Sequence, residues 1–146
     1  QQRLISEMPT AHKVSFLEGN YDDSCFFEAV KGYEDCREGG DRCKICYRLR
    51  LEETAKVAKL GSFDYFSTTL TISPLKNALA INEIGNDLAE KYSVKWLPSD
   101  FKKNEGYKRS IELSRQYSLY RQNYCGCVFS MNEAKNRVAG SSEEKM

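Results

Sequence analysis

Two stretches of the chain repeat their apolar residues with the 3.6-residue period of an amphipathic helix. The first covers residues 43–60, and its apolar face consists of Tyr47, Leu51, Ala55 and Ala58. The second runs on to residue 92, and its apolar face consists of Leu75, Ala78, Ile81, Ile84, Leu88 and Tyr92. Gly61 is expected to end the first helix, because glycine suits a helix C-terminus. Ser73 and Pro74 are expected to begin the second, as N-cap and first helical residue.

Shorter signals separate and flank these two helices. Stretches rich in β-branched and aromatic residues predict three strands, at residues 13–17, 63–68 and 94–97. Further helices are expected at residues 1–8, 25–33 and 106–117. Asp22, Asp23 and Ser24 can cap the helix at 25–33, and the two glycines of residues 38–41 predict a turn.

Strands that alternate with helices predict an α/β fold with three layers, Rossmann-like (HUP-like), around a mainly parallel sheet. We expect one domain over residues 1–137 and a polar, disordered tail over residues 138–146. Such folds bind ligands beyond the carboxyl ends of their strands. Thr68, Thr69 and Asp100 follow the second and third predicted strands, and should therefore point at one cleft.

Composition narrows the function. No run approaches the ~20 apolar residues of a membrane helix, and the first residues lack a signal-peptide core, so a cytoplasmic protein is expected. The net charge of +1 gives no indication that the protein binds nucleic acid. Residues 100–121 carry a local surplus of three basic residues, which fits either a solvated helix face or an RNA contact. His12 is the only histidine and is expected at the surface, so neither a Ser-His-Asp triad nor a histidine-rich metal site is expected.

Cys43 and Cys46 form a C-x-x-C pair at the mouth of the first long helix. Two intervening residues let both sulfurs reach one ion. The helix N-terminus and the nearby cations Arg42, Lys44 and Arg48 are expected to favour thiolates, and thiolates are the ligands of zinc and of iron–sulfur clusters. The alternative is a buried cysteine pair on an amphipathic helix.

Cys125 and Cys127 form a C-x-C pair in a predicted loop. A disulfide in so small a ring is strained and easily reduced, as in redox catalysts. The pair could equally bind a metal, or the two cysteines could be unrelated. Because 78 residues separate Cys46 from Cys125, a compact zinc ribbon is excluded. Cys25 and Cys36 have no close partner in the sequence, and incidental or structural roles are expected for them.

Several segments occur in the order found in a known family. The segment at residues 38–46, E-G-G-D-R-C-K-I-C, resembles the E-G-G-x-R-C-x-x-C motif of the cobalamin-independent epoxyqueuosine reductases of the QueH type. The later agreeing segments are F-S-T-T-L at 66–70, S-P-L-K at 73–76, D-F-K-K at 100–103, G-Y-K-R-S at 106–110 and Y-R-Q-N-Y-C-G-C at 120–127. The resemblance covers about residues 20–130.

The resemblance implies the last step of queuosine synthesis, in which the epoxide of epoxyqueuosine in the tRNA anticodon loop is reduced to an alkene. It implies a four-iron, four-sulfur cluster bound by Cys43 and Cys46. It also implies that Cys125 and Cys127 form a redox dithiol or ligate a second, mononuclear iron. The family pattern opens with a strand and two adjacent cysteines that complete the cluster site. This sequence has no adjacent cysteine pair and is expected to begin one βα unit later.

Further roles follow as hypotheses. Asp100 and Tyr107 are candidates for proton delivery or iron ligation, with a helix cap as the alternative for Asp100. Residues expected to contact the tRNA substrate are Thr68, Thr69, Lys76, Lys102, Lys103 and Arg121. The expected partners are tRNA and an unidentified electron donor, without a membrane. Two other functions fit the same thiols: a non-catalytic metal- or RNA-binding module, and a protein thiol oxidoreductase that uses Cys125 and Cys127.

Overall fold

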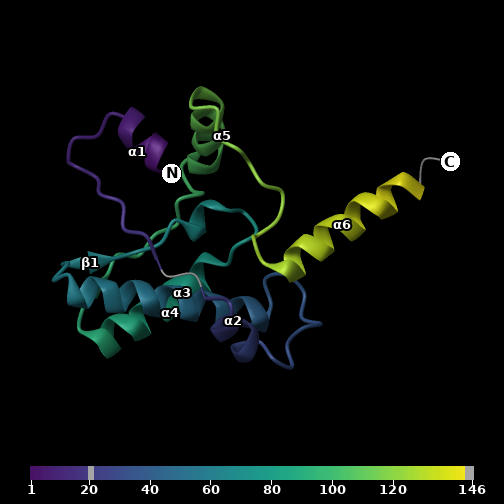
Figure 1. The fold of residues 1–146 in the computed structure, drawn as a ribbon, viewed down its shortest axis with the longest axis horizontal. Helices are drawn as coiled ribbons and strands as arrows, with labels where there is room; N and C mark the ends of the chain where they lie inside the picture. The colour runs from purple at the N-terminus through teal and green to yellow at the C-terminus, as the bar shows by residue number, and fades with distance from the viewer. Residues whose placement is uncertain (20–21, 144–146) are drawn as a thin grey trace.

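A computed structural model describes residues 1–19 and 22–143, with side chains as far as residue 136. In chain order the elements are α1 (Gln2–Glu7), α2 (Ser24–Ala29), α3 (Asp41–Leu60), β1 (Tyr65–Phe66), the 3-10 turn η1 (Leu70–Ile72), α4 (Ala78–Tyr92), β2 (Lys95–Trp96), α5 (Gly106–Gln116) and α6 (Val128–Glu143) (Figure 1). The chain therefore has an α/β fold that is mostly helical and contains a small sheet.

The sheet consists of β1 and β2, which pair in parallel with Tyr65 opposite Lys95 and Phe66 opposite Trp96. Side chains alternate between the faces of a strand. Phe66 and Trp96 are buried and meet edge to face with ring centroids 5.0 Å apart. Tyr65 and Lys95 lie on the other, exposed face. Among the described residues the helices thus cover one face of the sheet, and the expected three-layer arrangement is not confirmed.

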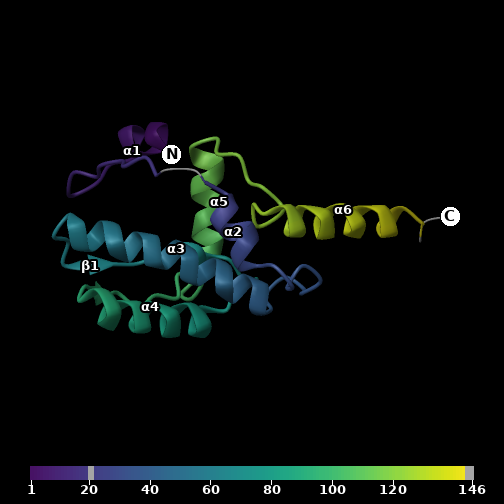
Figure 2. The same cartoon turned by 60° about the horizontal axis from the view of Figure 1, so that its bottom comes forward.

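The core lies between this face and the helices α3 and α4, which run alongside each other (Figure 2). Residues of the predicted apolar faces are buried there, namely Tyr47, Leu51, Ala55 and Ala58 from α3 and Ile81, Ile84 and Leu88 from α4. Apolar burial of this kind is the main favourable term in folding. The predicted periodicity is confirmed for α3 and for residues 78–92 of α4, whereas Leu75 lies before α4 and is 62% exposed.

Two residues of α4 fit against Trp96. A Cβ atom at Gly85 would lie 2.3 Å from the indole ring, so only glycine allows this approach. Asn82 accepts hydrogen bonds from Trp96 Nε1 at 2.9 Å and from the backbone N–H of Ser99 at 3.1 Å. Its amide nitrogen donates to the Ser99 carbonyl at 2.9 Å. Asn82 therefore holds the segment that follows β2 against α4.

Several predicted boundaries differ from the structure. Helix α4 begins at Ala78, because Asn77 caps it by accepting from the Ala80 N–H at 3.2 Å, whereas Ser73 and Pro74 lie in the preceding turn. The strand expected at residues 13–17 is wrong: no strand is assigned there, and Val14, Phe16 and Leu17 are exposed. An extended segment without a pairing partner forms no sheet.

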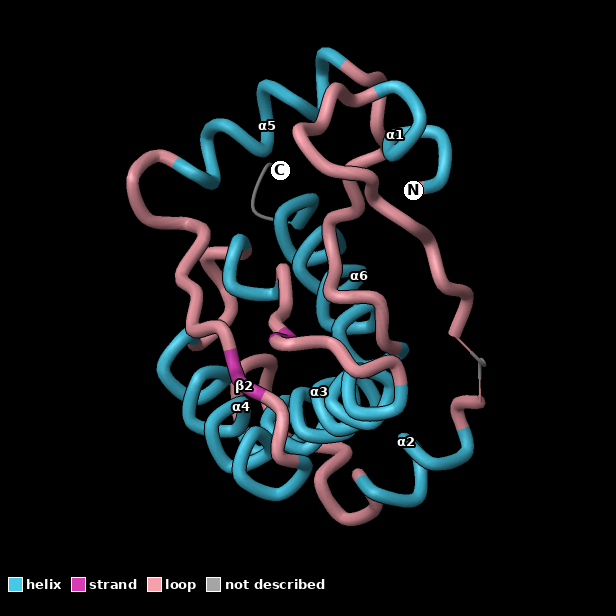
Figure 3. The backbone as a smooth tube through the Cα atoms, turned by 90° about the vertical axis from the view of Figure 1, so that its left-hand side faces the viewer, coloured by secondary structure: helices cyan, strands magenta, loops and turns pink. Residues whose placement is uncertain are grey.

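The remaining helices lie outside the α3–α4 core. Arg3 of α1 donates to the Tyr117 carbonyl just after α5 at 2.8 Å, which places α1 beside the end of α5 (Figure 3). Helix α6 extends away from the rest of the chain (Figures 1 and 2). Of the tail predicted for residues 138–146, the structure describes the backbone of residues 138–143, which belongs to helix α6, and residues 144–146 lie outside the described residues. Within the described part, no helix has the length and apolarity needed to cross a membrane.

Candidate functional site

Lys76 lies at the centre of the candidate site. Its side chain is 5% exposed, and its Nζ donates to Glu38 Oε1 at 3.0 Å and to Cys125 Sγ at 2.9 Å. Burial disfavours the ammonium charge, but the hydrogen bonds to Cys125 and Glu38 outweigh it and raise the pKa of Lys76. Lys76 therefore remains charged and joins three segments that are far apart in sequence: the turn before α3, the segment before α4, and the loop before α6.

Cys43 and Cys46 lie in the first two turns of α3, where Cys43 is buried and Cys46 is partly buried. The Gly39 N–H donates to Cys43 Sγ at 3.2 Å. Burial raises the pKa of the Cys46 thiol, and the Arg50 guanidinium lowers it in part. The two cysteine pairs, distant in sequence, are brought to one region by Lys76, which donates to Cys125 and to Glu38, next to the Gly39 that donates to Cys43.

The loop with Cys125 and Cys127 is held by the start of α6. Ser130 is buried, accepts from the Cys125 N–H at 2.9 Å, and donates its own N–H to Cys127 Sγ at 3.4 Å. Gly126 has a φ of +106°, which glycine adopts without strain. No disulfide joins Cys125 and Cys127 in the structure.

Tyr47 lies in the core, on the buried side of the site. It is 3% exposed, and its hydroxyl has no hydrogen-bond partner among the described residues. Burial raises the pKa of Tyr47 to about 12, and Lys76 opposes that shift while the charges of Cys43, Cys125 and Cys46 add to it. The phenol therefore keeps its proton, close to both cysteine pairs.

The three cations expected to favour the thiolates are paired with carboxylates instead. Lys44 contacts Asp41 at 2.9 Å, and Arg48 contacts Asp87 at 2.7 Å. Arg42 is buried, contacts Glu133 at 3.1 Å, and stacks over the Phe129 ring.

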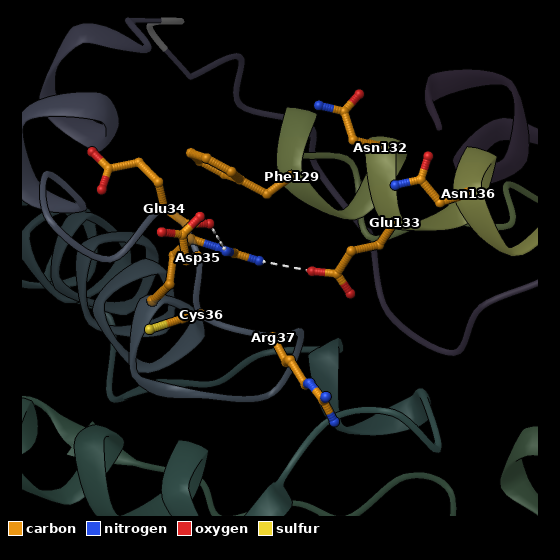
Figure 4. A pocket seen from close by; sticks show the side chains of 9 residues that line it. Glu34, Asp35, Cys36, Arg37, Phe129, Asn132, Glu133 and Asn136 are labelled. Atoms are coloured by element: carbon orange, nitrogen blue, oxygen red, sulfur yellow. Dashed lines mark hydrogen bonds and ion pairs between the residues drawn. The ribbon is translucent and has the colours of Figure 1, made fainter.

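Figure 4 shows this ion pair at a pocket of about 960 Å³ between the turn before α3 and helix α6. The nearby cations that act on the thiols are Arg50 and Lys76.

The cysteines are the right donors for a metal group that is bound by thiolates, but the described residues do not supply a complete set of ligands. Among the described residues, no three Cys, His, Asp or Glu side chains are placed to hold one ion. The fit rests on free thiols from two segments that face one region, on Lys76 beside them, and on the Tyr47 hydroxyl that lacks a partner.

A second cavity, of about 610 Å³, lies between the N-terminus of α4 and the segment after β2. The predicted substrate residues that line it are Lys76, Lys102 and Lys103, together with Asp100. Lys102 contacts Asp100 at 2.7 Å and Lys103 contacts it at 3.6 Å. The hydrogen bond from Lys102, aided by Lys103, lowers the pKa of Asp100, so this side chain is a carboxylate at neutral pH. The cavity thus shares Lys76 with the cysteine site.

Other predicted residues lie apart from this cavity. Thr68 accepts from the Leu70 N–H at 3.2 Å, and Thr69 precedes η1, so both shape the chain after β1. Tyr107 lies in the first turn of α5, with the Arg121 guanidinium 5.8 Å from its ring centroid. Among the described residues, these four side chains do not line the second cavity.

Two residues of the site escaped the sequence prediction. Glu38 was interpreted as part of a turn, although its place in the E-G-G segment beside the cysteines was a signal that could have marked it. Tyr47 was assigned to the apolar face of α3, and only its hydroxyl distinguishes it from a pure core residue. Their roles depend on contacts across the fold, which spacing along the chain does not reveal.

Comparison with known proteins gives consistent matches. The profile of the family described as epoxyqueuosine reductase QueH matches residues 1–133. The Streptococcus pyogenes protein named epoxyqueuosine reductase QueH is 48% identical over 131 residues, which are 88% of this chain and 51% of that protein. The Staphylococcus aureus and Thermotoga maritima proteins of that name are 47% and 42% identical, over 89% and 82% of this chain and 56% and 62% of their own lengths. The chain thus spans about half the length of the relatives it matches.

Proposed function

The chain belongs to the epoxyqueuosine reductase QueH family, and we propose that its protein reduces the epoxide of epoxyqueuosine in the tRNA anticodon loop to the alkene of queuosine. The observation that carries this proposal is that two cysteine pairs, 78 residues apart in sequence, face one region around the buried Lys76. Family membership makes the protein an oxidoreductase, and this arrangement supplies the thiols that such chemistry uses.

We propose a four-iron, four-sulfur cluster as the cofactor, with Cys43 and Cys46 as two of its four cysteine ligands. The resemblance assigns the other two to the adjacent cysteine pair of the family pattern. When bound, the cluster supplies electrons, which come from a donor that is not yet identified. The Gly39 N–H, already directed at Cys43 Sγ, stabilises that sulfur as a thiolate.

Reduction of an epoxide to an alkene takes two electrons and two protons and releases the oxygen as water. We propose that Cys125 and Cys127 act beside the cluster, either as a dithiol that gives two electrons and becomes a disulfide or as ligands of a second iron. Lys76 orients Cys125 through its hydrogen bond and balances a thiolate there.

The second cavity is the proposed place for the substrate. Lys102 and Lys103 at its rim suit phosphate contacts, and Arg121 beside Tyr107 suits a further backbone contact or a stacked base. Because Asp100 lines this cavity and is held as a carboxylate by Lys102, it suits iron ligation. Tyr107, which does not line the cavity, is kept as a candidate for proton delivery or iron ligation only if the substrate reaches α5. Thr68 and Thr69 would position the segment after β1. A tRNA substrate also implies that the protein works in the cytoplasm.

One face of the β1–β2 sheet is exposed, although the predicted three-layer fold would cover both faces. Tyr65 is more than half exposed there, with the Lys95 ammonium over its ring. We propose that other parts of the family's greater length cover this face and extend the sheet, which would complete a three-layer Rossmann-like fold.

The experiment compares Cys46→Ala with Cys25→Ser, a change at an exposed cysteine outside the site. The full-length proteins are purified without oxygen and analysed for iron, sulfide and reduction of epoxyqueuosine in tRNA. We expect Cys46→Ala to lose the iron–sulfur chromophore and the activity, and Cys25→Ser to keep both. A loaded and active Cys46→Ala protein would refute the proposal. Equimolar zinc would indicate a structural module, and a titratable dithiol without metal would indicate a protein thiol oxidoreductase.

A further inference from the structure

The Tyr47 hydroxyl is an unusual group in this core. The side chain is 3% exposed, and its oxygen has neither a hydrogen-bond partner among the described residues nor contact with solvent. Leaving a buried donor unpaired costs stability, and buried polar groups in native proteins are therefore nearly always paired. A phenylalanine would fill the same space without that cost. A tyrosine at this position therefore indicates that the hydroxyl finds its partner in a group that the protein binds.

The position of Tyr47 identifies the place of that group. It follows Cys46 directly and lies one helical turn after Cys43, so the side chains of Cys43 and Tyr47 share a face of α3. Both belong to the same buried cluster. Hydrogen bonds link Cys43 to the other segments of the site, because Gly39 donates to Cys43 and Lys76 joins the neighbouring Glu38 to Cys125. The Tyr47 side chain therefore lies beside Cys43, on the buried side of the site.

Three other donors of the site point at cysteine sulfurs. The Gly39 N–H donates to Cys43, the Lys76 ammonium donates to Cys125, and the Ser130 N–H donates to Cys127. The buried Tyr47 hydroxyl is a further donor beside them and has no acceptor among the described residues. Its acceptor is thus expected to be one more sulfur, contributed when the site is occupied.

We propose that Tyr47 Oη donates a hydrogen bond to a sulfur of the redox group held by Cys43 and Cys46, and thereby raises the reduction potential of that group. This inference rests on the proposed function, because it needs a thiolate-bound, sulfur-containing group at these cysteines. Reduction adds negative charge, and a donor at a sulfur stabilises the more negative state. Tyr47 therefore sets the reduction potential of this group from the buried side of the site.

The test uses Tyr47→Phe in the full-length protein, first without the group. The variant removes only an oxygen that has no partner there, so we expect a denaturation midpoint equal to or above that of the wild type. Tyr92→Phe is the matched control, because the Tyr92 hydroxyl donates to Glu52 at 2.7 Å and its loss should lower the midpoint. A lower midpoint for metal-free Tyr47→Phe would assign the hydroxyl a partner within the protein and overturn the inference.

The second arm measures the proteins after iron and sulfide are bound. We expect Tyr47→Phe to bind both at the wild-type ratio and to show a more negative midpoint potential, while Tyr92→Phe keeps the wild-type potential. Loaded Tyr47→Phe with an unchanged potential would overturn the inference and leave the proposed function standing. A wild-type protein that binds neither iron nor sulfide would overturn the proposed cofactor, and the inference with it.

Discussion

Lys76 Nζ lies 2.9 Å from Cys125 Sγ while it also pairs with Glu38, inside a site where both charged side chains are at least 88% buried. Burial has already removed these charges from water. Loss of one partner therefore leaves the other charge buried without compensation, which destabilises the fold. The same ammonium that holds the turn before α3 thus also fixes the thiol of the loop before α6. Lys76 therefore contributes both to the packing of the turn before α3 and to the position of the Cys125 thiol.

Replacing Lys76 is therefore expected to be costly. We predict that Lys76→Met lowers the free energy of unfolding by about 3 kcal/mol, because Glu38 loses its buried counter-charge. The double variant Lys76→Met/Glu38→Gln should recover part of that loss, since no carboxylate is then left behind. Urea denaturation of the wild type, Lys76→Met, Glu38→Gln and the double variant measures the coupling between the two side chains. Equal losses for the single and double variants would contradict the importance of the pair.

Gly85 offers a test of the core that is independent of the site. A methyl group there would meet the Trp96 ring at 2.3 Å, so we predict that Gly85→Ala destabilises the protein by about 1–3 kcal/mol through overpacking. Gly19→Ala is the matched control, since its Cβ would meet nothing within 4 Å. The fluorescence of Trp96, the single tryptophan, follows unfolding in both. A Gly85→Ala protein as stable as Gly19→Ala would show that the ring can move aside.

The contact between α3 and α4 should respond to acid through Glu52. The hydrogen bonds from Lys91 and Tyr92 lower the pKa of Glu52 below its ordinary 4.5, so their stabilisation is present above pH 4.5 and is lost as the pH falls through the lowered pKa. We predict that Glu52→Gln costs up to about 1 kcal/mol at pH 7 and nothing once Glu52 is protonated.

Thermal unfolding from pH 7 to pH 3 checks this prediction. Glu53→Gln provides the control, because the Glu53 side chain is 71% exposed and pairs with exposed Lys56 at 3.6 Å. Its difference from the wild type should stay small at every pH. A difference between Glu52→Gln and the wild type that persists at the lowest pH would rule out the ion pair as its cause.

Substrate contact is tested at Lys103, whose side chain is 75% exposed at the rim of the second cavity. If it contacts a tRNA phosphate, Lys103→Gln should weaken tRNA binding and reduce the slope of log Kd against log salt by about 1. Lys59→Gln, at the end of α3 remote from the cysteines, should change neither. Titrations at several salt concentrations separate the two. Identical slopes for Lys103→Gln and wild type would remove Lys103 from the interface.

The sequence predicted most of the elements because their signals are local. The apolar period of α3, ending at Gly61, and the β-favouring residues around Phe66 and Trp96 depend on near neighbours and are confirmed. The start of α4 was wrong because two capping signals competed, and the Asn77 side chain, not Ser73, forms the cap. The strand at residues 13–17 failed for the opposite reason, since a strand needs a partner that local composition cannot supply.

The site could be predicted only as far as its residue types. Spacing marked both cysteine pairs, and the ordered motifs marked Lys76 as a substrate residue. Its actual contacts with Glu38 and Cys125 join positions 38 and 49 residues apart, which no local pattern encodes. Arg42 shows the converse: its place beside Cys43 suggested a thiolate partner, but the fold directs it to Glu133.

The long reach of these contacts has a consequence for synthesis on the ribosome. Helix α3 carries its two cysteines early, but Cys125 and Cys127 emerge about 80 residues later. Until then, the nascent chain presents a half-built site, and closing so long a loop costs entropy that only the finished contacts offset. The contact of Lys76 with Cys125 therefore forms only after this segment has left the ribosome.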